Sequence, residues 1–103
     1  MKIIRKLSDM IEDELEGACE YVRKALELKD EDRSLADTLY QLSQEEMGHM
    51  KILHEQVVRK IEEYRKAKGE PPSTMMAVYE YLHGKHIDKA NSIEVYQKMY
   101  AER

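Results

Sequence analysis

The sequence has 103 residues, a formal net charge of −4 and a single cysteine, Cys19. This length suits one small domain, residues 1–103, and the negative charge argues against nucleic acid as a partner. Charged residues make up 37% and hydrophobic residues 42%, which is typical of a folded helical protein and excludes a disordered chain. We expect no membrane contact, because no apolar run approaches the ~20 residues of a span and no signal peptide is visible. One cysteine allows no internal disulfide, so we expect a cytoplasmic location.

Glycine and proline are sparse, and the pattern therefore predicts an all-α fold of long helices. The second helix should end at Gly69, because the two prolines that follow cannot continue it. In the third helix, Asn91-x-x-Glu94 has the form of a capping box, so a break near residue 91 is one alternative. The predicted helices cover about residues 8–28, 33–67 and 73–100, and residues 1–7 could extend the first of them backwards.

The second helix contains Glu46-x-x-His49, which places a carboxylate and an imidazole one turn apart on one side. Glu46 lies near the middle of the apolar stripe, where the pattern favours leucine. A buried carboxylate is costly unless it is paired or bound to a metal. The stripe consists of Leu35, Leu39, Leu42, Met50, Leu53, Val57, Ile61 and Tyr64.

The first helix supplies a second inward carboxylate, Glu14. With a helical rotation of about 100° per residue, Glu14 lies about 60° from the centre of the apolar stripe of this helix. If the first two helices form an antiparallel hairpin, Glu14 lies level with Glu46. The direction in which the side chains point and their height along the hairpin therefore both indicate that Glu14 and Glu46 lie together. In another register, Glu16 or Glu20 would replace Glu14.

Other candidates receive less weight. The second Glu-x-x-His, Glu80 to His83, would lie on the order of 17 Å from the first along the neighbouring helix. His54, His83 and His86 fall at one level and could form a cluster. In a hairpin of the second and third helices, Glu94 would lie beside Glu46 as an additional ligand.

Glu14, Glu46 and His49 are thus the predicted metal ligands. Three ligands can hold one metal, whereas a dinuclear carboxylate site in a helical bundle takes one Glu from each of two helices and a Glu-x-x-His from each of the others. Two copies of the hairpin supply that set, which predicts a homodimer or a higher homo-oligomer. Mixed carboxylate and imidazole ligands suit iron or manganese, and zinc is an alternative.

The run Glu14-Leu15-x-x-Ala18-x-x-Tyr21, followed by Glu45-Glu46-x-x-His49 and Leu53, resembles the ferritin-like di-iron superfamily, including bacterioferritins and rubrerythrins. The resemblance implies a half-ferritin, a hairpin plus a third helix whose ferritin-like four-helix bundle is completed by dimerisation. It also implies that Glu14 is the terminal ligand, that Glu46 bridges two irons and that Tyr21 lines the site.

The resemblance further implies a non-haem di-iron protein, a ferroxidase-type oxidoreductase that oxidises Fe(II) with O2 or peroxide. The alternative hypothesis is a helical scaffold or interaction protein with a structural metal or none. In that case the long second helix would expose its far half as the surface for a partner.

Overall fold

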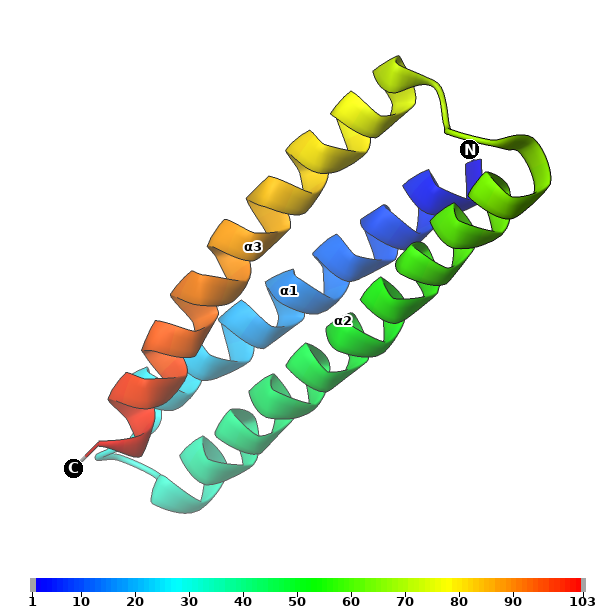
Figure 1. Ribbon diagram of the computed structural model, residues 1–103. Coiled ribbons are helices and arrows are strands. Elements are labelled where there is room, and N and C mark those ends of the chain that lie inside the picture. The colour runs from blue at the N-terminus through cyan, green and yellow to red at the C-terminus, as the bar shows by residue number, and fades with distance from the viewer. Residues whose placement is uncertain (1, 103) are drawn as a thin grey trace.

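The computed structural model describes residues 2–102, which form three α-helices and no strand. They are α1 (Lys2–Leu28), α2 (Arg33–Lys68) and α3 (Ser73–Ala101), as Figure 1 shows. The all-α prediction is therefore confirmed. The molecule is elongated, with extents of 55 × 18 × 18 Å. No helix within residues 2–102 combines the length and apolar character needed to cross a membrane.

The ends of α2 follow from local chemistry. Its first turn is capped by the Asp32 side chain, which accepts a hydrogen bond from the backbone N–H of Leu35. At the other end, Gly69 takes a φ of 83°, a left-handed conformation that glycine adopts without strain. Its N–H donates to the carbonyl of Arg65 and closes the last turn.

The structure decides between the alternatives left open at two helix boundaries. The first helix begins at Lys2 rather than near residue 8. Ile4 is buried in the same core cluster as Ile61, and this burial stabilises the additional N-terminal turns. The third helix runs through residue 91 without a break. Ile93 is fully buried there, and its packing keeps the backbone helical across the capping-box sequence.

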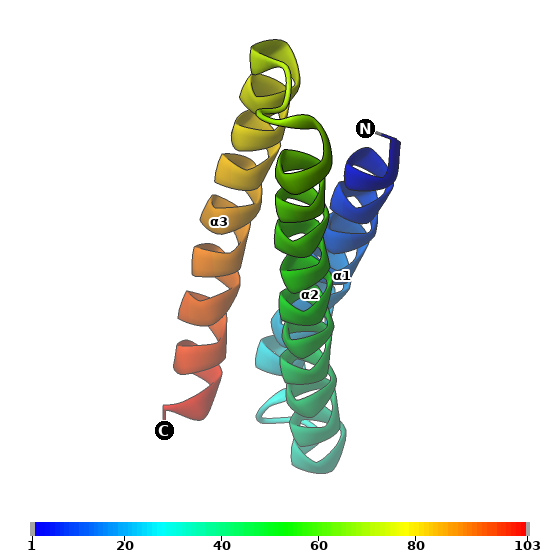
Figure 2. The same cartoon turned by 45° about the vertical axis from the view of Figure 1, so that its right-hand side comes forward.

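The central element is α1, which packs antiparallel against α2 over most of its length. The third helix packs mainly on α1, and Figure 2 shows its ribbon separated from that of α2 over its C-terminal half. Side chains bridge this separation, since Gln97 and Tyr100 of α3 hydrogen-bond to Ser43 and Asp37 of α2. The predicted hairpin of the second and third helices has the expected register, since His83 stacks on His54 and Gln97 donates a hydrogen bond to Ser43. Glu94, placed beside Glu46 by that hairpin, is exposed.

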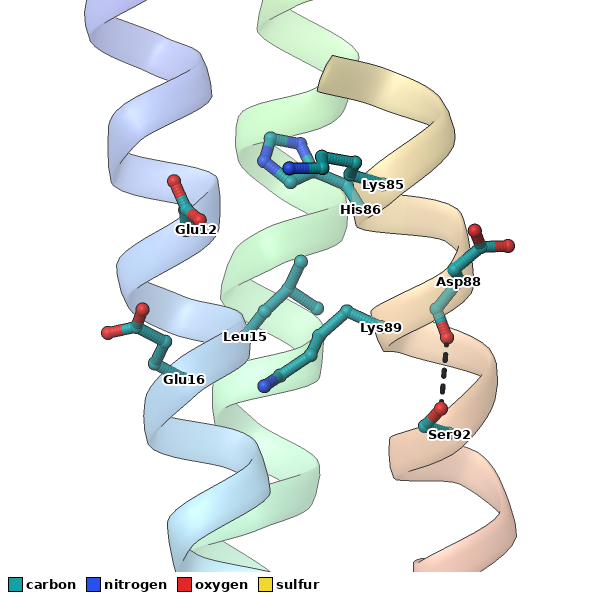
Figure 3. A pocket seen from close by; sticks show the side chains of 8 residues that line it. All are labelled: Glu12, Leu15, Glu16, Lys85, His86, Asp88, Lys89 and Ser92. Carbon is teal, nitrogen blue, oxygen red and sulfur yellow. Dashed lines mark hydrogen bonds between the residues drawn. The ribbon is translucent and has the colours of Figure 1, made fainter. Parts of the chain in front are cut away.

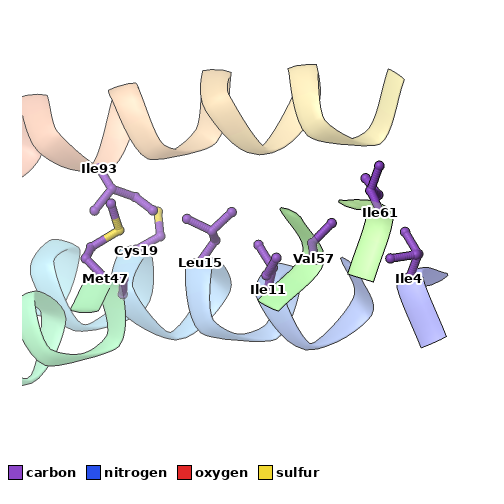
Figure 4. Packing of buried hydrophobic residues seen from close by; sticks show 9 residues of the cluster. Ile4, Ile11, Leu15, Cys19, Met47, Val57, Ile61 and Ile93 are labelled. Carbon is purple, nitrogen blue, oxygen red and sulfur yellow. The ribbon is translucent and has the colours of Figure 1, made fainter. Parts of the chain in front are cut away.

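The core is a row of aliphatic and sulfur side chains between the helices. Cys19, Met47 and Ile93 form one layer to which all three helices contribute (Figure 4). Beside it, the buried hydroxyl of Ser43 donates to the carbonyl of Ala18 at 2.7 Å and accepts from Gln97 at 3.0 Å. This hydrogen-bonded chain joins α1, α2 and α3 in an interior that would otherwise leave these groups unsatisfied.

The C-terminal end of α3 is tied to the turn between α1 and α2. The phenol of Tyr100 donates to the carboxylate of Asp37 and its ring stacks on Tyr40 at 4.7 Å between centroids. Lys29 donates to the carbonyl of Tyr100 at 2.6 Å and lies over its ring at 5.0 Å from the centroid. These contacts fix the end of α3 to the first turns of α2 and to the turn that precedes them.

The predicted histidine cluster lies in the groove between α2 and α3. The His54 and His83 rings stack at 4.8 Å between centroids, and Tyr79 stacks on His83 at 5.6 Å. His86 lines the same groove, together with apolar side chains such as Met50. Burial lowers the pKa of His54 and of His86, although Glu55 opposes the shift at His54 and Glu12 and Asp9 oppose it at His86.

We expect the free energy of unfolding to fall as the pH is lowered from 7.5 to 5.5. The pKa values of His54 and His86 are lower in the fold, so the unfolded chain binds more protons over this interval. Urea unfolding at a series of pH values measures the slope. The double variant His54→Gln/His86→Gln should flatten that slope, and an unchanged slope in the variant would contradict the assignment.

Candidate metal centre

Glu14 of α1 meets Glu46 and His49 of α2 on the face where the two helices pack. One potential ligand atom from each of the three lies within 4.8 Å of the other two. His49 Nδ1 is 3.4 Å from Glu14 Oε2 and 3.9 Å from Glu46 Oε1. The three side chains that the sequence predicted to lie together do so. Metal binding by these three residues stays a prediction.

The three side chains are placed where water reaches one side of the group only. The carboxylate side chains of Glu14 and Glu46 are 26% and 25% exposed, whereas that of His49 is 56% exposed. Within this half-open setting, Glu14 Oε2 is itself buried and has no hydrogen-bond partner among the described residues. A buried carboxylate oxygen without a donor is unfavourable, and a cation at this point would satisfy it.

The pKa of Glu46 is raised. The largest cause is the neighbouring carboxyl of Glu14, which would accept a hydrogen bond from the protonated form of Glu46, and burial adds to the shift. Repulsion from Glu14 acts in the same direction, and the charge of His49 opposes it. Two carboxylates held this close favour either a shared proton or a shared cation, which is the electrostatic requirement of a metal centre.

The donor set fits a first-row transition metal. Carboxylate oxygens suit hard cations, and an imidazole nitrogen moves the preference towards iron, manganese or zinc. Three protein donors from Glu14, Glu46 and His49 leave coordination positions for solvent, a second metal or a partner chain. The exposed side of His49 lies where such a ligand would enter.

Gly17 completes the site, and the sequence pattern did not reveal it. A Cβ at this position would lie 3.2 Å from Glu46 Oε2 and 3.6 Å from Glu46 Cδ. The carboxylate of Glu46 therefore crosses from α2 to rest against the backbone of α1. Gly48, which lies inside the Glu-x-x-His motif, shows no such role, since no atom lies within 4 Å of its added Cβ.

The alternative carboxylates do not reach the centre. Glu16 and Glu20 are exposed, as is Glu80 of the second Glu-x-x-His. Glu16 and Glu12 instead face Lys85 and Lys89 across a groove of about 400 Å³ between α1 and α3 (Figure 3). These residues line a groove of mixed charge and bring no group of metal ligands together.

The other histidines lie apart from the centre, in the groove between α2 and α3. Among residues 2–102, Glu14, Glu46 and His49 are the only three metal-ligating side chains whose ligand atoms come this close. Tyr21 is half-buried on the same face of α1 as Glu14 but two turns further on, about 10 Å along the axis. It is therefore a neighbour of the ligands along the helix rather than part of the group.

Comparison with known proteins supplies no relative of this chain. No family model matches it, and neither a curated protein nor a solved structure is significantly similar. The chemistry of the centre is accordingly argued from its own residues and their geometry.

We expect Glu14→Gln to stabilise the metal-free protein by about 1 kcal/mol at pH 7. Its amide would donate to the Glu46 carboxylate and replace a like-charge contact with a hydrogen bond to a charged group. Urea unfolding in the presence of a chelator measures the change. The matched control is Glu16→Gln, an exposed position on the same helix, which should leave the stability unchanged. A loss of stability in Glu14→Gln would contradict this description of the carboxylate pair.

Proposed function

We propose that the protein is a homodimeric, non-haem di-iron protein of ferritin-like type that oxidises Fe(II) with O2 or peroxide. The observation that carries the proposal is the convergence of Glu14, Glu46 and His49 around a buried carboxylate oxygen that lacks a partner. The lone cysteine favours a reducing compartment, and we place the protein in the cytoplasm.

The face that carries the centre supports pairing of two chains. Ile3 and Met10 of α1 and Leu35 of α2 are exposed there, although their side chains are apolar. Half-buried apolar residues continue the same face around the ligands, at helical spacings of three or four residues. These are Leu7 and Tyr21 on α1 and Leu42 and Leu53 on α2. An apolar face of this kind marks an interaction surface.

A second copy of this chain on the α1–α2 face would supply the remaining ligands of a dinuclear site. Two α1–α2 hairpins joined about a two-fold axis form a four-helix bundle, with α3 of each chain on the outside. Each chain then contributes Glu14 and the Glu46-x-x-His49 pair, which together make the six-residue set of a dinuclear carboxylate site. The third helix does not obstruct this arrangement, because it packs on the flank of α1 that carries Leu15 and Cys19.

Each residue has a distinct role in this proposal. Bound iron supplies the electron-transfer chemistry. Glu14 and Glu46 would both hold iron, and their negative charges would balance the increased charge of the ferric state. The imidazole of His49 is a neutral donor that helps to set the reduction potential. Leucine side chains on both sides of the ligands exclude water except at the exposed edge.

Anaerobic titration of the metal-free protein with Fe(II) tests the proposal. We expect two irons per dimer and, on admission of air, the absorbance of the ferric protein. Glu14→Ala, Glu46→Ala and His49→Ala should each reduce uptake, whereas Glu20→Ala, an exposed carboxylate on α1, should not. Absence of uptake, or uptake unchanged in Glu46→Ala, would favour the scaffold alternative.

The dimer face is tested separately. We expect Met10→Glu to weaken self-association at least about tenfold, because a charge would be buried in an apolar interface, and this corresponds to ~1.4 kcal/mol. Sedimentation equilibrium measures the association. Val95→Glu, which changes an exposed apolar residue on α3, is the matched control and should leave the dimer intact. A dimer that survives Met10→Glu but not Val95→Glu would place the interface on α3.

The far half of α2, which the scaffold alternative assigns to a partner, is less exposed than the sequence suggested. In the far half of α2, Val57 is fully buried and Ile61 nearly so, and both share a core cluster with Ile4 of α1. The N-terminal turns of α1 thus cover part of the surface that this alternative assigned to a partner, while Ile52 and Val58 stay exposed. The expectation that the far half of the second helix is exposed was wrong for Val57 and Ile61.

A further inference from the structure

We infer that Gly17 is a positioning residue for the metal centre: it leaves the space on α1 that lets the Glu46 carboxylate lie beside Glu14. This inference rests on the proposed function, since it concerns the same centre. It adds a residue that binds no metal itself and that lies outside the Glu-x-x-His motif.

The geometry shows a close approach of a side chain to a helix backbone. Gly17 follows Glu14 by three residues, so both lie on the side of α1 that faces the Glu46 side chain. From the position of a Cβ on Gly17, the distances to Glu46 Oε2, Cδ and Cγ are 3.2, 3.6 and 3.8 Å. Only the first is tighter than an ordinary contact. The outer end of the carboxylate is therefore the part that a methyl group would displace.

The displacement would act on the ligand and not on the fold. The Glu46 carboxylate is the flexible end of a side chain, so it can move by a few tenths of an ångström while the α1–α2 packing persists. A shift of that size changes where its oxygens lie relative to Glu14 and His49. Metal affinity depends on such positions, and changes in residues that orient ligands typically weaken it roughly tenfold or more.

Other glycines in the helices provide matched controls. Gly48 lies between Glu46 and His49, and Gly84 lies on α3, and neither has an atom within 4 Å of an added Cβ. All three positions are helical, so each change to alanine should favour the helix by a similar amount. A difference between Gly17→Ala and the controls consequently reports on the contact with Glu46 rather than on helix propensity.

The first experiment is anaerobic equilibrium dialysis of the purified full-length protein against Fe(II). We expect Gly17→Ala to bind iron roughly tenfold more weakly than the parent or bind less of it, with Gly48→Ala and Gly84→Ala like the parent. Thermal unfolding without metal should show Gly17→Ala at least as stable as the parent, so that weak binding is not the result of misfolding. Parent-like iron binding in Gly17→Ala would overturn the inference.

The second experiment needs no metal and separates this inference from the proposed function. In a double-mutant cycle, Gly17→Ala is introduced into the parent and into Glu46→Ala, and the thermal midpoints are compared in the presence of a chelator. We expect a larger increase in the Glu46→Ala background, where no carboxylate meets the new methyl group. Equal increases would overturn the contact between Gly17 and Glu46. Coupling in the cycle without iron uptake by the parent would sustain the contact and reject the di-iron function.

Discussion

The packing of α1 against α2 is the contact on which the rest of the molecule depends. Its buried residues, from Ile4 at one end to Ala36 at the other, hold two helices of 27 and 36 residues in one register. That register brings Glu14 of one helix to Glu46 of the other. It also creates the surface on which α3 lies, and α3 packs more closely on α1 than on α2.

An unfavourable feature is built into this packing. Two carboxylates lie side by side, one oxygen of Glu14 is buried without a donor, and Gly17 replaces a better helix former to admit Glu46. A protein selected only for stability would place a leucine at position 46 and an alanine at position 17. Such local costs concentrate at functional sites, and a cation would remove most of this one.

The third helix has a different relation to the centre. It is held by the layer of Cys19, Met47 and Ile93 and by the contacts of Tyr100, on the side of α1 away from the ligands. Three of the four histidines line its groove with α2, where burial lowers the pKa of two of them. The α1–α2 face is thereby left uncovered by α3, and these histidines lie apart from the candidate metal centre.

The sequence by itself determined the helical class and the ends of α2, and it favoured the pairing of Glu14 with Glu46, because helical periodicity and a short turn restrict the register of the hairpin. The structure excluded the alternative register with Glu16 or Glu20, since both are exposed. Contacts in the tertiary structure decided the start of α1, the continuity of α3 and the position of α3, which the periodicity of the sequence does not specify. Burial of Ile4 extended α1 to Lys2, burial of Ile93 kept α3 unbroken, and the closer packing of α3 on α1 than on α2 was decided by the three helices together. The role of Gly17 also appeared only in three dimensions, since a residue without a side chain leaves no pattern until its neighbour across the helices is known.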